Sequence, residues 1–215
     1  MMRYKIGGWM QLMIGLTFMS LGLTLMIKAD LGMSPWGVFQ LGISYKFGIP
    51  FGLGVQIVGF FLLFIAYFLG KIKPKSGTIV NMFVVGLIID LIFYPVIPFI
   101  TILWQQIVFM VLSTIILAAG TSIYMSADLG AGPRDSLMMA IFVITNKSLR
   151  FIRTLMEITV LVIGFFLGGK VGAGTVIYAL SFGVLMQASF KLLKRLPLNL
   201  VRIDILKYKE KRDEY

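Results

Sequence analysis

Residues 29–35 read Ala-Asp-Leu-Gly-Met-Ser-Pro, and residues 127–133 read Ala-Asp-Leu-Gly-Ala-Gly-Pro. The second stretch begins 98 residues after the first (127 against 29) in a chain of 215 residues. Each stretch directly follows a long apolar run. An internal repeat in an apolar chain is typical of membrane transporters that are built from two related halves. The pair therefore predicts a duplicated chain in which each half contains a helix that breaks and restarts.

The correspondence continues outside these two stretches. Gly22 corresponds to Gly120, and Phe-Leu-Gly at 68–70 corresponds to Phe-Leu-Gly at 166–168, again at an interval of 98 residues. Several matches in register over most of both halves indicate a duplication. We therefore divide the chain into a first membrane repeat (1–100), a second membrane repeat (101–195) and a basic cytoplasmic tail (196–215).

The composition is that of an integral membrane protein. The chain is 59% hydrophobic and 13% charged, with a mean hydropathy of +0.95. A soluble domain with this balance would have too little polar surface to cover itself, so we expect the lipid bilayer to surround it. The net charge of +11 suggests nucleic acid at first sight. We assign it instead to basic residues at the cytoplasmic ends of the spans and expect no nucleic-acid partner.

The apolar runs predict an all-α, polytopic bundle of transmembrane helices. Two shorter runs, 34–46 and 133–146, begin at the repeated stretches. At 1.5 Å per residue each reaches roughly 20 Å, less than the ~30 Å hydrocarbon core, so each is re-entrant, tilted or half-helical. The six runs that are long enough to span are 6–27, 51–70, 77–98, 103–125, 151–168 and 173–190.

The distribution of basic residues bears on whether the short segments cross. If they do not, each half crosses three times and the halves are inverted. The inside then holds 17 of the 20 Lys and Arg residues, and only Lys28, Lys46 and Lys170 lie outside. If they do cross, the division is 14 against 6. The positive-inside rule favours the inverted arrangement, with both termini in the cytoplasm.

The two ends of the chain leave alternatives open. The first run follows Arg3 and Lys5 and resembles a signal peptide, but no small-x-small cleavage site follows it, which favours a first transmembrane helix. The tail after residue 195 mixes apolar and basic side chains. It is either a helix lying on the anionic inner leaflet or a solvated end.

The repeated stretches themselves are the first candidate site. Proline suits the first helical turn, Ser34 is a good N-cap, and glycine permits a sharp turn. Broken helices inside the bilayer would direct N–H groups toward a ligand, whereas at the surface the same stretches are ordinary loops. Arg134 and Asp135 follow the second stretch only, either for a charged ligand or, as slightly favoured, as an inside anchor. The candidate substrate-binding or coupling residues here are Asp30, Ser34, Pro35, Asp128, Gly132 and Pro133.

Carboxylates within the apolar runs are the second candidate site. Asp90 and Glu157 are costly in hydrocarbon unless they are paired, protonated or hydrated, so they are candidates for proton coupling. One residue drops out of the second half after residue 168, so that Gly-Thr at 77–78 corresponds to Gly-Thr at 174–175, an interval of 97 residues. At this interval Asp90 corresponds to Gln187, which puts a polar group at one depth in both halves. The alternative is hydrogen bonding that holds the helices together.

Catalytic and metal-binding patterns are missing from the sequence. The chain has no Cys and no His, and it has no Gly-x-Ser-x-Gly or Walker-type loop. Asp30, Asp90 and Asp128 have no surrounding catalytic signature. We therefore expect no enzymatic activity, no cofactor and no metal.

The chain resembles the bacterial YczE/YyaS/YitT membrane proteins over about residues 10–190. The resemblance rests on residues 29–36, on Gly-Ala-Gly-Thr at 172–175, and on Gly183. It implies a small multi-pass protein of the bacterial cytoplasmic membrane, and it carries no substrate with it.

These observations favour a transporter of a small molecule that binds between the two repeats near the middle of the membrane. The alternative is a non-transporting accessory protein that scaffolds or regulates a membrane partner. A bundle of 24.0 kDa is also compatible with a homodimer.

Overall fold

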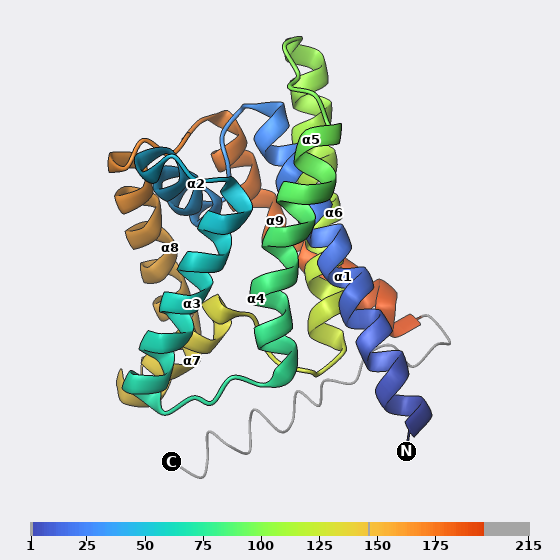
Figure 1. Ribbon diagram of the computed structural model, residues 1–215, viewed down its shortest axis with the longest axis vertical. Coiled ribbons are helices and arrows are strands. Elements are labelled where there is room, and N and C mark those ends of the chain that lie inside the picture. Colours follow the sequence, from blue (N-terminus) through green and yellow to red (C-terminus); the bar gives the residue numbers. More distant parts are fainter. Residues whose placement is uncertain (1, 146, 196–215) are drawn as a thin grey trace.

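The computed structural model describes residues 2–145 and 147–195, and within them it consists of helices joined by turns (Figure 1). The expected all-α class is confirmed. The tail, residues 196–215, lies outside the described residues. The helices are α1 (Met2–Ala29), α2 (Pro35–Phe47), α3 (Phe51–Gly70), α4 (Ser76–Ile88), a π-helical turn η1 (Ile89–Phe93), α5 (Tyr94–Val96), α6 (Leu103–Ser126), α7 (Pro133–Thr145), α8 (Leu149–Phe166) and α9 (Ala173–Arg195).

Five of these helical segments are long and apolar enough to cross a membrane: Gly7–Ala29, Phe51–Gly70, Ser76–Val96, Leu103–Ser126 and Ala173–Arg195. The sixth expected span is the 18-residue helix α8. It differs from the other five because Arg150, Arg153 and Glu157 lie on it. The spans expected from sequence are therefore all helices, but one of them carries charges that a lipid-facing helix would not tolerate at membrane depth.

The long helices run back and forth between the two ends of the molecule (Figure 1). α1 starts at the end that holds the N-terminus and runs to the opposite end, α3 returns, and α4 runs upward again. α6 then descends, α8 rises and α9 descends. The two short helices do not cross the molecule: α2 lies in the upper part of the view and α7 in the lower part.

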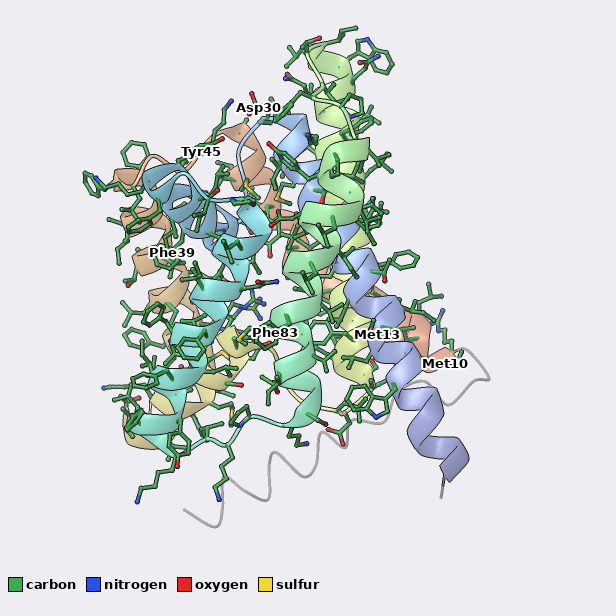
Figure 2. All side chains as sticks on the ribbon, in the orientation of Figure 1. Met10, Met13, Asp30, Phe39, Tyr45 and Phe83 are labelled. Atoms are coloured by element: carbon green, nitrogen blue, oxygen red, sulfur yellow. The ribbon has the colours of Figure 1, made fainter. Side chains whose placement is uncertain are left out.

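The outer surface of the bundle is largely apolar, as expected for contact with lipid. Figure 2 shows Met10, Met13 and Phe83 on this surface, and all three side chains are exposed. Asp30 and Tyr45 lie instead at the upper end of the molecule. A soluble protein rarely exposes so much continuous apolar surface.

The most extensive helix packing joins α1 to α6. A Cβ atom added to Gly22 would lie 2.8 Å from the backbone nitrogen of Leu117, and one added to Gly120 would lie 2.6 Å from that of Met19. Gly15 meets Tyr124 in the same way. Small residues allow two membrane helices to approach closely, so these glycines bring α1 and α6 together as the centre of the bundle.

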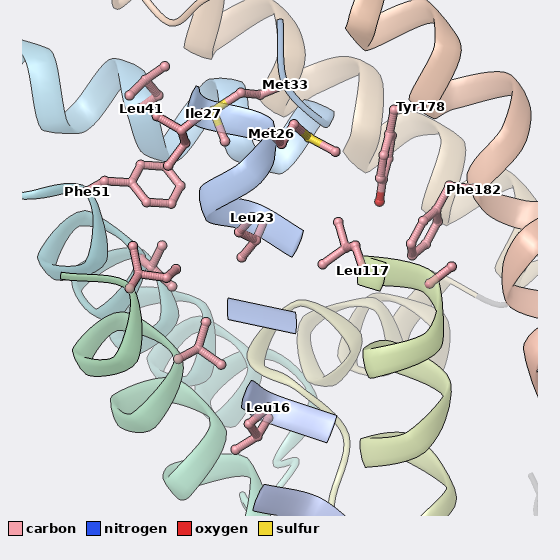
Figure 3. Close-up of a cluster of buried hydrophobic side chains, with 14 of the residues drawn as sticks. Leu16, Leu23, Met26, Ile27, Met33, Leu41, Phe51, Leu117, Tyr178 and Phe182 are labelled. Carbon is pink, nitrogen blue, oxygen red and sulfur yellow. The ribbon is translucent and has the colours of Figure 1, made fainter. Parts of the chain in front are cut away.

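α4 and α9 pack against this central pair, α4 on α1 and α9 on α6. The remaining helices pack mainly on one another: α2 contacts α8, and α3 contacts α7 and also α4. A cluster of buried apolar side chains fills the space between them, and part of it is drawn in Figure 3. Leu12, Leu16, Met26 and Met110 in this cluster have no exposed surface.

We predict that Gly22→Ala lowers the free energy of unfolding by about 1–3 kcal/mol, because the new methyl group overlaps the backbone of α6. The melting temperature of the protein in detergent should fall accordingly. Gly183→Ala is the matched control, since a Cβ atom at that helical position would meet no atom within 4 Å. Equal melting temperatures for the two variants would contradict the close contact.

Candidate functional site

The two repeated stretches form two breaks with the same backbone path. In the first break, between α1 and α2, Asp30 has φ 60° and Gly32 has φ 109°. In the second, between α6 and α7, Asp128 has φ 55° and Gly130 has φ 136°. Glycine adopts positive φ at no steric cost and aspartate tolerates it, so the Asp-Leu-Gly sequence suits both turns.

Each break is held by the first turn of a distant helix. The Gly77 N–H at the start of α4 donates to the Leu129 carbonyl at 3.0 Å, and the Gly174 N–H at the start of α9 donates to the Leu31 carbonyl at 2.8 Å. A Cβ atom on Gly32 would lie 2.6 Å from the Gly172 nitrogen, so only glycine fits there. These contacts satisfy backbone groups that a break in a membrane helix would otherwise leave unpaired.

An ion pair lies beside each break. Lys170 pairs with Asp30, and Lys75 Nζ lies 3.7 Å from Asp128 Oδ1. The four side chains are 41–61% exposed. Asp30 and Asp128, both candidates from sequence, therefore lie at the surface ends of the breaks and do not line the cavity described next.

A cavity of ≈ 100 Å³ lies between the breaks and is lined by residues from both halves of the chain. Ser34, which precedes α2, and Gly132 and Pro133, which open α7, all line it, and all three are candidates from sequence. Pro35 is buried at the start of α2. Leu23, Leu117, Tyr178 and Phe182, which Figure 3 labels in the buried apolar cluster, also line the cavity. The remaining lining residues are Met19, Trp36, Gln40, Val55, Gly59, Leu62, Asn81, Met82, Thr121, Tyr124, Arg134 and Asp135.

The first turn of α7 brings a charged pair into this cavity. Arg134 Nε lies 3.7 Å from Asp135 Oδ1, and the two side chains are only 27% and 16% exposed. The Tyr124 hydroxyl donates to Asp135 Oδ2 at 3.3 Å, and the Tyr178 hydroxyl interacts with the Arg134 guanidinium. The slightly favoured view of Arg134 as an inside anchor does not fit this position, because the side chain lines the cavity.

Asn81 adds a polar group that has no partner. Its side chain is 5% exposed, and Nδ2 forms no hydrogen bond. A Cβ atom placed on Gly132 would lie 3.9 Å from this nitrogen, 3.2 Å from the Tyr124 hydroxyl and 3.8 Å from Asp135 Oδ2. A buried donor without an acceptor costs about 1–3 kcal/mol, so an amide held in this position needs an explanation.

Two further spaces adjoin the cavity through shared lining residues. One of ≈ 340 Å³ shares Tyr178 and Phe182 with it and is lined by Glu157 and Gln187, both candidates from sequence. A smaller one links Arg134 to Glu157, whose Oε1 accepts a hydrogen bond from Arg153 Nε at 3.2 Å. Glu157 and Gln187 thus lie beside the central cavity, separated from it by the side chains that line both spaces.

Asp90 lies elsewhere and has a different environment. It is in the turn η1, where it accepts hydrogen bonds from the backbone N–H groups of Gly52 at 2.7 Å and Leu53 at 3.0 Å. These are first-turn groups of α3, which have no intrahelical acceptor. The carboxylate therefore caps α3 and stabilises its positive end, in agreement with the structural alternative for this residue.

Sequence reasoning assigned no role to Asn81, Tyr124 or Tyr178. A signal for two of them was present, since Asn81 and Tyr178 lie 97 residues apart, at the same interval as Asp90 and Gln187. Tyr124 gave no such signal, because a tyrosine in an apolar run looks like part of the core. In residues 2–145 and 147–195, no group of three or more Asp, Glu, His or Cys side chains is arranged to hold a metal ion.

Comparison with known proteins gives three uncharacterised bacterial relatives and one family. The "Uncharacterized membrane protein YczE" of Bacillus subtilis is 34% identical over 84% of this chain and 84% of its own length. An "Uncharacterized protein" of Haemophilus influenzae is 31% identical over 86% and 84%. The "Uncharacterized protein YyaS" of Bacillus subtilis is 27% identical over 85% and 92%.

The family is described as "Family of unknown function (DUF6198)" and matches residues 6–191. No solved structure matches the chain. The resemblance to the YczE and YyaS proteins is confirmed. Together with the long apolar helices, it makes the chain a multi-pass integral membrane protein with bacterial homologues.

We predict that Asp90→Ala lowers the free energy of unfolding by about 1–3 kcal/mol, because two N–H groups of α3 lose their acceptor. Asp128→Asn serves as the comparison, since it keeps a residue that tolerates φ 55° and removes only a half-exposed ion pair worth about 0–1 kcal/mol. Thermal unfolding in detergent measures both. If Asp90→Ala were as stable as Asp128→Asn, the capping role would be wrong.

Proposed function

The chain belongs to the DUF6198 family, and we propose that it transports a small molecule across the membrane, with the substrate bound in the cavity between the two breaks. The observation that carries this proposal is the charged pair Arg134–Asp135 in an apolar bundle. Charged groups within membrane helices are costly and are typical of substrate or ion pathways. A scaffold protein would gain nothing from placing them at an internal cavity.

We further infer that the two halves are inverted repeats. Each long helix of the first half runs in the direction opposite to that of its counterpart in the second half, α1 to α6, α3 to α8 and α4 to α9 (Figure 1). The contacts between the halves support this inference. Because α2 corresponds to α7 and α3 to α8, the contact of α2 with α8 has its equivalent in the contact of α7 with α3. In the same way, the hydrogen bond from Gly174 to Leu31 has its equivalent in the hydrogen bond from Gly77 to Leu129. Transporters with inverted repeats bind substrate where half-helices end between the repeats.

The ion pairs at the two breaks suit a mechanism of alternating access. Asp30, which pairs with Lys170, lies at the upper end of the molecule (Figure 2). Lys75 and Asp128 pair where the loop before α4 meets the turn between α6 and α7, toward the opposite end (Figure 1). Each pair ties a break from one half to a segment of the other. Breaking one pair at a time would open the cavity to one side while the other side stays closed.

The charge distribution supports an orientation with the N-terminus in the cytoplasm. The loop 71–75 between α3 and α4 carries three lysines, whereas the opposite end holds Lys28, Lys46 and Lys170. The positive-inside rule therefore assigns the lower end of Figure 1 to the cytoplasm.

Single cysteines in this naturally cysteine-free chain test the proposal. We expect Lys73→Cys and Lys170→Cys to react with a membrane-impermeant thiol reagent from opposite faces. We expect Ser34→Cys and Gly132→Cys to react from both faces, because the cavity opens to each side in turn.

Leu16→Cys is the control, since this fully buried position lies outside the lining of the cavity and should stay unlabelled in the folded protein. Failure of both cavity positions to react from either face would refute a transport pathway and favour the accessory role. Labelling of Lys73→Cys and Lys170→Cys from one face would refute the inverted arrangement.

The ion pairs give a separate prediction. We expect Lys170→Gln to increase labelling of Gly132→Cys from the Lys170 face, and Lys75→Gln to increase it from the other face. A half-exposed pair is worth about 0–1 kcal/mol, so the increase should reach at most about fivefold. Lys46→Gln removes an exposed cation from α2 and should change neither rate. An increase from the same face in both variants would contradict the gating role.

A further inference from the structure

We propose that the substrate is a short monocarboxylate, which binds through Arg134, Asn81 and the first turn of α7 while its hydrocarbon part contacts the apolar cavity wall. This inference rests on the proposed function, because it names the class of molecule that the same cavity accepts. Three features carry it: the charge balance of the site, an unpartnered buried donor, and the size of the space.

The charge balance leaves room for one negative charge. Arg134 and Asp135 offset each other, and the neighbouring Arg153 and Glu157 do the same. Two helix N-termini, those of α2 and α7, remain at the cavity, because Ser34 and Gly132 line it. Each contributes roughly +0.5 of an elementary charge, so their sum is about one positive charge. A monoanion complements this site better than a cation or a dianion does.

The opposite helix ends, at the C-termini of α1 and α6, lie at the same breaks but contribute little to the lining of the cavity. No residue of the last turn of α1 (26–29) lines it, and of the last turn of α6 (123–126) Tyr124 alone does. At the breaks the cavity is therefore lined mainly by residues that start helices.

The two helix N-termini differ, and the difference places the anion at α7. The Ser34 hydroxyl accepts from the Gly37 N–H at 3.1 Å and caps α2. Gly132 stands at the corresponding position of α7 and has no side chain to cap with. The unpartnered Asn81 Nδ2 lies beside the space above Gly132. A carboxylate oxygen in this space would accept from Asn81 and would take the place of the missing cap. Asp135 Oδ2 lies 3.8 Å from a Cβ atom placed on Gly132, and its charge is offset there by Arg134 and by the Tyr124 hydroxyl.

Arg134 can hold the second oxygen while it stays near Asp135. A guanidinium carries five N–H donors, and Asp135 approaches it at Nε, at 3.7 Å. Asp135 is itself held by the Tyr124 hydroxyl. The remaining donors of Arg134 suit the planar, two-oxygen geometry of a carboxylate.

The size and lining of the cavity select a short organic acid. Its volume of ≈ 100 Å³ is well below the roughly 300–1,000 Å³ of typical ligand pockets. An apolar cavity of about 150 Å³ holds benzene, so a chain of a few carbon atoms fits here. Most of the wall is apolar, including Leu23, Val55, Leu62 and Met82, which favours a hydrocarbon tail over a bare inorganic anion.

Four compounds of one size test this inference: butyrate, butyramide, butylamine and 2-aminobutyrate. The readout is the fluorescence of Trp36, which lines the cavity. Trp9→Phe and Trp104→Phe together leave it as the single tryptophan in the purified full-length protein. We expect butyrate to change the emission saturably and to bind at least tenfold more tightly than the neutral amide. Nitrate, which is planar but has no tail, should bind more weakly than butyrate.

Variants separate the proposed contacts from general charge effects. We expect Arg134→Gln and Asn81→Ala each to weaken butyrate binding by about tenfold or more, because each removes a hydrogen bond to a charged group. Asn81→Ala removes a side chain whose Nδ2 has no protein partner, so it keeps the test valid if Arg134→Gln fails to fold. Lys71→Gln removes an exposed cation and should leave binding unchanged.

The inference is overturned if butyramide binds as tightly as butyrate, if butylamine or 2-aminobutyrate binds more tightly, if nitrate equals butyrate, or if no compound binds. Uptake of labelled butyrate into proteoliposomes separates it from the proposed function. Butyrate binding without uptake would support the ligand class and refute transport. Uptake of the amine or the amide without butyrate binding would refute the ligand class and support transport.

Discussion

The cross-connections that close the two helix breaks are the constraint on which the rest of the structure depends. An interrupted helix in a membrane protein exposes backbone groups that lipid cannot satisfy. Here the Leu31 and Leu129 carbonyls each accept a hydrogen bond from the first turn of a helix in the other half, at Gly174 and Gly77. The breaks are therefore stable only when both halves are assembled, and the same assembly encloses the cavity between them.

Charged side chains in this bundle serve two different physical purposes. Asp90 binds two N–H groups of α3, so its charge is used by the protein itself. Arg134 and Asp135 line a cavity and contact each other at 3.7 Å, longer than a normal hydrogen bond. This loose pair lies next to the unpartnered Asn81 amide, and in the transport that we propose it would exchange contacts with the ligand. The two carboxylates, Asp90 and Asp135, therefore differ in the groups that surround them in the fold, which their positions in the sequence do not reveal.

Much of the fold follows from local sequence. The apolar runs predict the long helices, and Asp-Leu-Gly followed by proline predicts each break, because glycine and aspartate permit positive φ and proline opens a helix. The site is less predictable. Ser34, Gly132 and Pro133, which are candidates from sequence, line the cavity, whereas Asp30 and Asp128, also candidates, pair with lysines at the surface ends of the breaks. Whether a candidate side chain lines the cavity or lies at the surface depends on contacts with helices that are distant in sequence.

By itself, the sequence determined that the protein is an all-helical membrane protein with two matching helix breaks, since hydropathy and turn propensity act over a few neighbouring residues. Only the tertiary structure decided which polar groups meet. Asn81 on α4, Tyr124 on α6 and Asp135 on α7 come within about 4 Å of one point beside Gly132 because α1 and α6 pack glycine against backbone and bring the two halves together. Such convergence depends on the packing of whole helices, which no local pattern in the chain records.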